Sequence, residues 1–469
     1  MTTRIEKDSM GPLAVPVDAY YGVQTQRAVT NFPISGWPLP PRFIHAMGRI
    51  KRAAARTNLE LGLIDKQVAG AIIAAAIEVV DGKLDAQFPV DIFQTGSGTS
   101  TNMNANEVIA SRANEILGGN RGDKTPVHPN DHVNLCQSSN DVIPTAIHIS
   151  VIKSIQGELL PALEHLRDAL AKQAADFDDI IKIGRTHLQD ATPVRLGQVF
   201  GGYAAQMENS IARARRAIAI LSELPLGGTA VGTGLNAHPE FAKLTIAKLA
   251  HELGIELREA RNHFEAAATR DACVEASGCL RTIAVSLAKI ANDIRLIGSG
   301  PRCGLGEIKL PAVQPGSSIM PGKVNPVIAE SLIQVSLWVI GSDLTVTLGG
   351  LQSFFELNVA MPLIGAQLLE SVYLLATGSR NFADACVAGL TVDRQHCESL
   401  VEQSLAMCTP LAPVLGYDKA AEIAKTAYQE GKTVRQVARE KSGLTEQQLD
   451  EIFNLRHLTE PGIRGKGGD

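Results

Sequence analysis

Four polar stretches carry the residues of this chain that could do chemistry. They are QTGSGTSTNMN (94–104), HPNDHVNLCQSSND (128–141), GRTHLQD (184–190) and GSSIMPGKVNP (316–326). Small hydroxyls and amides crowd each stretch, and with the N–H groups of glycines and helix N-termini they bind anions using few fixed charges. The same residue types cap helices, which is the better explanation for any single stretch. Four of them, each beside a long apolar pattern, favour a shared polar site.

The last of these stretches places a cation and an amide beside a pair of serines. Turn formation explains its glycines and prolines, but it does not explain Lys323 and Asn325 next to Ser317 and Ser318. Lys323 follows Ser317 by six residues, a spacing that suits a compact clamp for an anion. A loop lysine is usually only solvated, and a lone histidine such as His187 is usually structural, so the spacing alone assigns neither.

Other common chemistries are disfavoured by the sequence. The segment LGGTAVGTGLN (226–236) lacks the lysine of a phosphate-binding P-loop and follows a helix pattern rather than a strand. No H-E-x-x-H occurs, and the cysteines and histidines lack metal-ligand spacing. Gly96-Ser97-Gly98 is too short for a hydrolase nucleophile elbow. We therefore expect no metal and no cofactor.

Composition bounds the class of protein. Of 469 residues 45% are hydrophobic but only 4% aromatic, so Ala, Leu, Ile and Val must fill a core that suits helix packing. The net charge of -5, without a dense Lys/Arg run, disfavours nucleic acid and anionic membranes as partners. The charged N-terminus lacks the apolar stretch of a signal peptide. Seven scattered cysteines without a C-x-x-C pair suggest a reducing compartment, so we expect a cytoplasmic protein.

Apolar periodicity predicts a mainly α fold. Apolar residues recur at three- and four-residue steps over 155–170, 200–221 and 280–297, which predicts long amphipathic helices. Segments 327–348 and 363–376 are apolar nearly all round, which predicts helices buried on several sides. Consecutive long helices joined by short loops indicate a helix bundle.

The flanks of the chain differ from this middle. Shorter helices are expected around 43–61 and 66–81, and short charged helices after about residue 395, where Thr445 and Gln448 could form a capping box. The tail GIRGKGGD has the composition of a frayed end. We therefore expect three domains, an N-terminal helical one, a central long-helix bundle and a small C-terminal helical one, spanning residues 1–137, 138–395 and 396–469.

The polar blocks resemble those of a known family. GSSIMPGKVNP closely resembles the signature loop of the fumarase/aspartase superfamily, and TGSGTSTNMNANEV, HPNDHVN, QSSND, GRTHLQDATPVRLGQ and GGTAVGTGLNAHPEFA resemble its other blocks, in order. The resemblance spans nearly the whole chain. It implies three mainly helical domains with a central five-helix bundle. It also implies a homotetramer with a twenty-helix core, in which each active site draws on three subunits.

The resemblance also implies a chemistry, namely elimination next to a carboxylate to give fumarate through an enediolate. It makes Ser317 the base on a mobile loop, has Lys323 and Asn325 hold the enediolate oxygens, and pairs His187 with Glu330 for acid/base work or water positioning. The residues matching the substrate-binding positions are Ser97, Gly98, Thr99, Ser138, Ser139, Asn140, Thr186, Ser318, Lys323, Val324 and Asn325.

A second, non-catalytic anion site is implied for the segment HPND, that is His128, Pro129, Asn130 and Asp131. Some members of the family carry a basic residue just before this motif, and Thr125 stands there in this sequence. The segment therefore lacks one expected source of positive charge.

Two members of the family are candidates. TGSGT, QSSND, GGTAVGTG and FELNV look like class II fumarases, whereas DAYYGVQTQRAVTNF, VIGSDLTVT and LTEQQLDEIF look like aspartate ammonia-lyases. Because the blocks near the site favour the former, we expect interconversion of L-malate and fumarate. The alternative is release of ammonia from L-aspartate. A non-catalytic structural homologue is disfavoured because Ser317, Lys323, Asn325, Thr186 and His187 are all retained.

Overall fold

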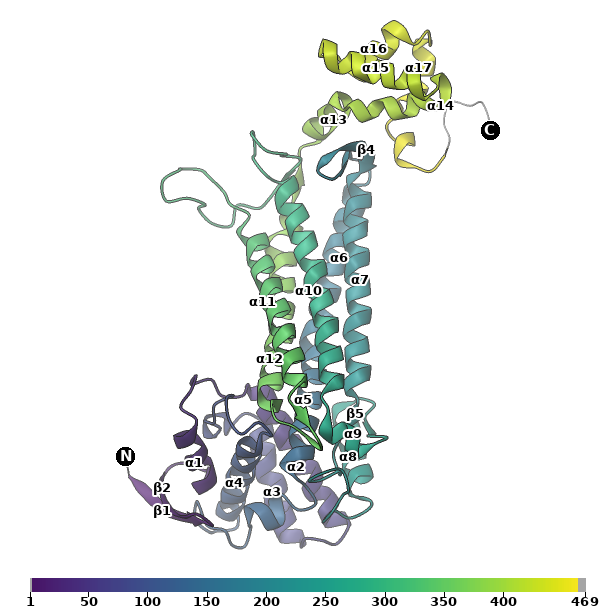
Figure 1. Ribbon diagram of the computed structural model, residues 1–469. Coiled ribbons are helices and arrows are strands. Elements are labelled where there is room, and N and C mark those ends of the chain that lie inside the picture. The colour runs from purple at the N-terminus through teal and green to yellow at the C-terminus, as the bar shows by residue number, and fades with distance from the viewer. Residues whose placement is uncertain (1, 463–469) are drawn as a thin grey trace. The chain divides into compact units, whose positions relative to one another are not determined.

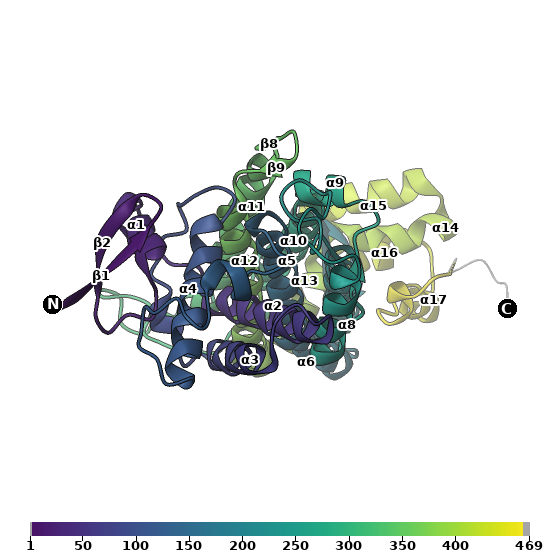
Figure 2. The ribbon, with the colours of Figure 1, turned by 90° about the horizontal axis from the view of Figure 1, so that it is seen from below.

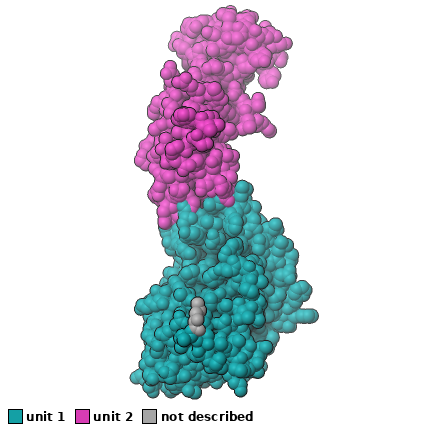
Figure 3. Space-filling model, turned by 90° about the vertical axis from the view of Figure 1, so that its left-hand side faces the viewer, with its two compact units in different colours: residues 1–161, 211–285, 335–377 teal, residues 162–210, 286–334, 378–469 magenta. Residues whose placement is uncertain are grey.

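The computed structural model describes residues 2–462, and the chain forms two compact units (Figure 3). Unit 1 holds residues 1–161, 211–285 and 335–377, and unit 2 holds residues 162–210, 286–334 and 378–469. The tail predicted to fray lies, apart from Gly462, outside the described residues. The three predicted domains, with boundaries at 137/138 and 395/396, remain a prediction.

Short helices and one hairpin begin unit 1. Strand β1 (Thr3–Asp8) pairs antiparallel with β2 (Gly11–Pro16), and α1 (Val23–Asn31) follows. The next helices are α2 (Pro41–Glu60), α3 (Lys66–Val80), α4 (Thr99–Ile116) and α5 (Ser139–Ser154). Helices α2 and α3 lie side by side in Figure 2 and confirm the two predicted helices. Pro41 opens α2 at a position where its missing N–H is harmless.

Five long helices continue the fold (Figure 1). They are α6 (Leu160–Asp176), α7 (Leu196–Leu221), α10 (Asp271–Ile297), α11 (Val327–Gly350) and α12 (Met361–Ala385). Side chains on the predicted seams are fully buried, as Ile283, Leu287, Ile290 and Ile294 of α10 illustrate. The mainly α class and the long central helices are thus confirmed.

Helix α11 departs from the prediction of burial on several sides. Its side chains Leu337, Trp338, Leu344 and Leu348 are all more than half exposed in the single chain. By length and composition α11 could also cross a membrane, although 33% of its most apolar window is already buried. The prediction was wrong for one chain, because one face of α11 packs within it while these side chains on the other faces are exposed in the described structure.

Strands that the sequence analysis did not anticipate appear as two-stranded sheets throughout the described part of the chain. In unit 2, β3 (Ile181–Thr186) and β4 (Gln189–Arg195) form a hairpin. The other short strands are β5 (Glu223–Leu224), β6 (Arg258–Glu259), β7 (Ile308–Lys309), β8 (Ser353–Phe354), β9 (Leu357–Asn358) and β10 (Thr391–Val392). Helices α8 (Phe241–Leu253) and α9 (His263–Ala268) complete unit 1.

The C-terminal part of unit 2 is a cluster of short helices around its own apolar core. They are α13 (Arg394–Gln403), α14 (Ala412–Leu415), α15 (Tyr417–Glu430), α16 (Val434–Lys441) and α17 (Glu446–Ile452). The predicted capping box of Thr445 and Gln448 is present, and Thr433 with Gln436 forms a second one. Ile183 of β3 packs in the same core as Ile423 and Phe453, which anchors the β3–β4 hairpin.

Candidate functional site

In unit 1 the predicted substrate-binding hydroxyls meet where α4 and α5 begin. The Thr99 hydroxyl lies 2.8 Å from the Ser97 hydroxyl and 2.8 Å from the Ser139 hydroxyl. Thr99 and Ser139 are the first residues of their helices, so the positive ends of two helix dipoles lie at this cluster. The arrangement favours an anion.

Two glycines make this close approach sterically feasible. A side chain on Gly96 would begin 1.9 Å from the carbonyl oxygen of Val359, and one on Gly98 would begin 2.8 Å from the side chain of Ile143. Gly98 also has φ +71°, in the left-handed region that other residues rarely adopt. The glycines of TGSGT therefore let α4 start against α5 and against the backbone of Val359, just after β9.

The stretch 138–141 is both a helix cap and part of this hydroxyl cluster. The Ser138 hydroxyl accepts from the Asn140 N–H, and Asp141 Oδ1 accepts from the Ser138 N–H, forming a capping box. The other Asp141 oxygen accepts from the N–H groups of Gly227 and Thr229, both at 3.0 Å. Burial raises the pKa of the Asp141 carboxyl, and these backbone donors oppose the rise.

The capping residues are further tied to the glycine-rich segment 226–236. The Asn140 side-chain amide donates to the Ala230 carbonyl at 2.8 Å. Together with Asp141, it fixes this segment against the start of α5. The segment therefore supports the polar loop rather than binding a phosphate itself.

A buried lysine beneath this cluster was missed by the sequence analysis. Lys51 of α2 is fully buried, and its ammonium donates to Asn134 Oδ1 and Gln137 Oε1, each at 3.0 Å. Burial lowers its pKa to about 7, which the charge of Asp141 opposes. The sequence did offer one sign that Lys51 is buried. It follows Met47 by four residues, which places it on the apolar face of α2. It holds the turn that leads into Ser138.

The predicted second anion segment forms one tight turn. Asn130 and Asp131 donate their backbone N–H groups to His128 Nδ1 at 3.2 Å, while Pro129 is buried. Asp131 Oδ2 also lies 3.2 Å from that nitrogen. Asn130 and Asp131 are exposed.

In unit 2 the β3–β4 hairpin presents Thr186 and His187 at its tip. Thr186 pairs with Gln189, so His187 and Leu188 form a two-residue turn with φ +56° and +61°. Such turns favour Asn and Gly, and a bulky residue there is strained. Leu188 is 73% exposed. Strain and exposed position at a predicted catalytic residue agree with a functional role for the tip.

An ion-pair cluster anchors the base of this hairpin. Glu307 is fully buried and accepts from Arg185 at both carboxylate oxygens, with Lys182 Nζ 3.3 Å away. Burial lowers the pKa of Lys182, against the opposing effect of Glu307. No sequence pattern indicated Glu307, because about 120 residues separate it from Thr186 along the chain.

The loop Gly316–Pro326 is closed on itself. The Gly316 N–H donates to the Lys323 carbonyl at 2.8 Å, and the Asn325 side-chain amide donates to the Gly316 carbonyl at 2.5 Å. A side chain on Gly316 would begin 2.4 Å from the Lys323 carbonyl oxygen. The loop therefore holds a defined shape while Lys323 and Val324 stay exposed at its tip.

Ser317 lies inside this loop with two donors aimed at its side chain. Its Oγ accepts from the backbone N–H groups of Ile319 and Met320 at 3.2 and 3.0 Å. Ser318 is exposed, and its hydroxyl makes no such bond within the described residues. Donors on an oxygen stabilise its negative form, so the geometry separates the two serines.

Glu330 lies in the first turn of α11 and forms no hydrogen bond or ion pair with His187 within the described chain. The predicted pairing of these two side chains therefore stays a prediction. No group of three His, Cys, Asp or Glu side chains that could hold a metal ion occurs among residues 2–462. Apart from His187, Glu330 and the segment 128–131, the predicted site residues are hydroxyls, amides, glycine and valine backbone and one lysine, which suit an anionic substrate.

Comparisons with known proteins agree with this chemistry. A family model described as Lyase matches residues 11–341, and one described as Fumarase C C-terminus matches residues 407–460. The chain is 52% identical to a class II fumarate hydratase of Methylorubrum extorquens, covering 98% of this chain and 97% of that one. It is 54% identical to one of Halobacterium salinarum, covering 98% of each.

Solved structures are similar over the same length. A class II fumarase of Schistosoma mansoni matches with TM-score 0.95 and 41% identity, covering 98% of this chain and 99% of that one. A fumarate lyase:delta crystallin of Brucella melitensis, solved bound to cobalt, matches with TM-score 0.95 and 47% identity, covering 98% and 100%.

Proposed function

Because the chain belongs to the class II fumarate hydratases of the fumarase/aspartase superfamily, we propose that it interconverts L-malate and fumarate by anti elimination, with Ser317 as the base. The observation that carries the assignment of the base is the pair of N–H groups on Ser317 Oγ. A serine is a weak base in water. Two fixed donors favour its alkoxide, which lowers its pKa, and Lys323 adds a positive charge to the same loop.

The base removes the proton next to one carboxylate of malate, and the electron pair moves onto that carboxylate as an enediolate. Preorganised donors stabilise such charge more than they stabilise the ground state. Lys323 supplies a cation and Asn325 an amide for the enediolate oxygens. Lys323 is exposed, so the loop must close on the substrate for this step.

The two carboxylates bind to the hydroxyls and helix N-termini. Thr99 and Ser139 are already joined by a hydrogen bond, and the positive ends of the α4 and α5 dipoles favour an anion there. The remaining binding groups of the proposal are Ser97, Gly98, Ser138, Asn140, Thr186, Ser318 and Val324.

His187 and Glu330 act on the hydroxyl group that leaves as water. The histidine donates to or positions that oxygen, and Glu330 orients the ring by accepting from its second nitrogen. The two side chains form no hydrogen bond or ion pair within the described part of one chain, so they are proposed to meet between subunits.

We propose a homotetramer whose active sites each take residues from three subunits. The support is the exposed apolar stripe of α11, including Leu337, Trp338 and Leu344. A stripe of this kind marks an interaction surface in most proteins. Packing the long helices of four chains together would cover it and give a twenty-helix core.

The second anion site at His128 to Asp131 and a cytoplasmic location are the remaining parts of the proposal. Release of ammonia from L-aspartate is its alternative activity, suggested by the blocks that resemble aspartate ammonia-lyases. The scattered cysteines, which include no C-x-x-C pair, support the location.

Ultraviolet absorbance of fumarate tests the activity directly. Purified protein should form fumarate from L-malate, and hydrate fumarate, with no nucleotide added. The same assay with L-aspartate should give at most a trace. Ammonia release from aspartate without malate turnover would refute the proposed substrate.

A further inference from the structure

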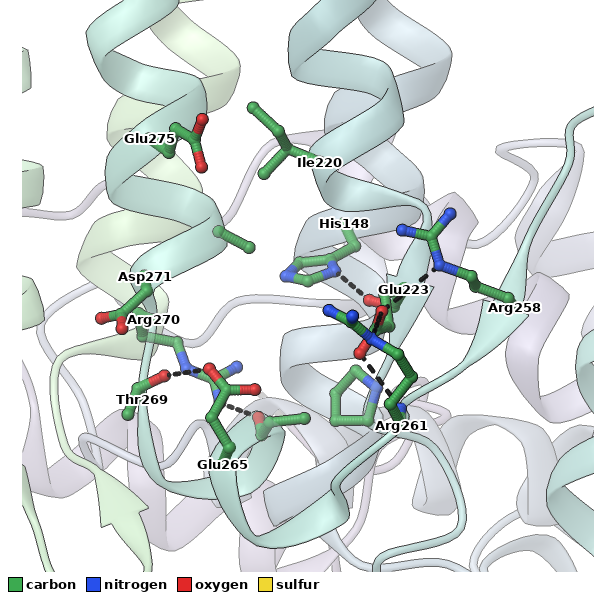
Figure 4. A pocket seen from close by; sticks show the side chains of 13 residues that line it. His148, Ile220, Glu223, Arg258, Arg261, Glu265, Thr269, Arg270, Asp271 and Glu275 are labelled. Carbon is green, nitrogen blue, oxygen red and sulfur yellow. Dashed lines mark hydrogen bonds and ion pairs between the residues drawn. The ribbon is translucent and has the colours of Figure 1, made fainter.

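Unit 1 contains a cavity of about 310 Å³ away from the hydroxyl cluster (Figure 4). It lies among α5, β5, β6, α9 and the start of α10. His148 lines it and follows Ser139 by nine residues on α5, which is about 14 Å along a helix axis. The volume is at the small end of ligand cavities, suited to a metabolite rather than a nucleotide.

The cavity contains a buried guanidinium without a carboxylate partner. Arg270 is 2% exposed and donates only to the carbonyls of Ala266 and Ala267. Its Nε has no acceptor, and no Asp or Glu oxygen of the described residues lies within ion-pair distance. Burial lowers the pKa of this guanidinium. An unpaired buried charge is unfavourable, so the cavity lacks one anionic group.

The other arginines of the cavity already have partners. Arg258 and Arg261 both bind Glu223, at 3.3 and 3.1 Å, and Glu275 binds Arg216 at 2.7 Å. Burial lowers the pKa of His148 to about 4, so this ring is neutral at physiological pH. Arg270 is thus the positive charge left for a ligand.

Two acidic side chains face the same space. Asp271 begins α10 and makes no ion pair with any described residue. Among the described residues, the Glu265 carboxylate accepts a hydrogen bond only from the Thr269 hydroxyl. Figure 4 shows Arg270, Asp271 and Glu265 around one side of the cavity. The positive charges around the cavity are those of Arg258, Arg261, Arg270 and Arg216, the partner of Glu275. The negative charges are those of Glu223, Glu265, Asp271 and Glu275. These charges balance, so a dianion gains no net attraction there.

We propose that this cavity binds a small α-amino acid, with its carboxylate on Arg270 and its ammonium on Asp271 and Glu265. A zwitterion supplies the missing anion without unbalancing the charge of the cavity. It also gives Asp271 a cationic partner. The site uses none of the proposed catalytic residues, so it stands independently of the proposed reaction.

Titration calorimetry of the full-length protein tests the ligand class. Glycine, L-alanine, L-serine and L-threonine form the panel. L-lactate replaces the amine of alanine by a hydroxyl, and L-alaninamide removes its carboxylate charge. At least one amino acid should bind saturably, with both analogues of alanine at least tenfold weaker than alanine itself or silent. Absence of saturable binding across the panel, or lactate binding as well as alanine, would overturn the proposal.

Two variants, Arg270→Met and Asp271→Asn, test the proposed binding residues, and Arg56→Met is the control. Arg270→Met should weaken binding at least tenfold while keeping or raising the melting temperature, since it removes a buried unpaired charge. Arg56→Met makes the same replacement at an exposed helix position and should bind normally. Asp271→Asn should weaken amino-acid binding severalfold. Unchanged affinity in Arg270→Met, or equal losses in Arg56→Met, would show that the ligand does not bind at this cavity.

Discussion

Arg185 donates from one guanidinium nitrogen to both carboxylate oxygens of Glu307, at 3.0 and 2.9 Å, and Glu307 is fully buried. Arg185 immediately precedes Thr186 and His187 at the tip of the β3–β4 hairpin. The pair therefore fixes the base of a strained turn whose tip carries two proposed site residues. Because Glu307 also lies close to Lys182, the anchor is a small buried network rather than a single bond.

Arg185→Lys should lower kcat about tenfold or more with little change in KM for malate. The charge is kept, but the ammonium of a lysine is a compact group on a flexible stem and would not hold the position of the guanidinium nitrogen, and a small displacement of His187 is costly for catalysis. Arg394→Lys is the matched control. Arg394 forms a bidentate ion pair with Asp179, and that carboxylate is exposed. Equal kinetics in the two variants would show that the Glu307 anchor does not position the hairpin tip.

Ser317→Ala should remove most turnover, by about a hundredfold or more, and leave the melting temperature within a few degrees. The substitution removes the acceptor of the Ile319 and Met320 N–H groups and the proposed base, yet loop residues contribute little to packing. Ser318→Ala should be much milder. Steady-state kinetics and thermal melting measure both, and an inactive Ser318→Ala beside a nearly normal Ser317→Ala would reverse the assignment.

Lys51 should make stability rise with pH above neutrality. Its pKa is about 7 when folded and 10.5 when unfolded, so between these values the unfolded chain binds more protons. Stability is then reduced below pH 7 and recovers as pH rises toward 10, by about 1 kcal/mol per unit. Urea midpoints at pH 7 and 9 should show this rise in the wild type.

The matched variants isolate that effect. Lys51→Met should lose the rise between pH 7 and 9, and Lys66→Met, at an exposed position of α3, should keep it. If Lys51→Met retained the full slope, another group would be responsible for it.

Mixed tetramers should recover activity from two inactive parents. If His187 and Ser317 of one site come from different chains, equal amounts of His187→Asn and Ser317→Ala protein, unfolded and refolded together, should leave roughly a quarter of the sites intact. Malate dehydration by the mixture is compared with each parent refolded alone. Mixed tetramers without activity above the parents would mean that one chain supplies both residues.

The local parts of this protein could be predicted from its sequence. The 3.5-residue apolar seams gave α6, α7 and α10, and the Thr445–Gln448 spacing gave a capping box, because these features depend on residues within a turn or two of each other. The polar blocks pointed to anion binding for the same reason, since each block carries its own donors.

Only the tertiary structure decided which distant residues meet. The burial of Lys51 under Asn134 and Gln137, and of Glu307 under Arg185, depends on helices and strands packing across about 80 to 120 residues, and no sequence spacing encodes such contacts. The φ values of His187 and Leu188 likewise follow from strand register, which sets the turn whatever residues occupy it. The exposed side of α11 could not be predicted from its all-round apolar pattern. That pattern indicates that the helix is buried on all sides, but not which surface covers each side. Whether its own chain or another surface provides that burial is decided by packing.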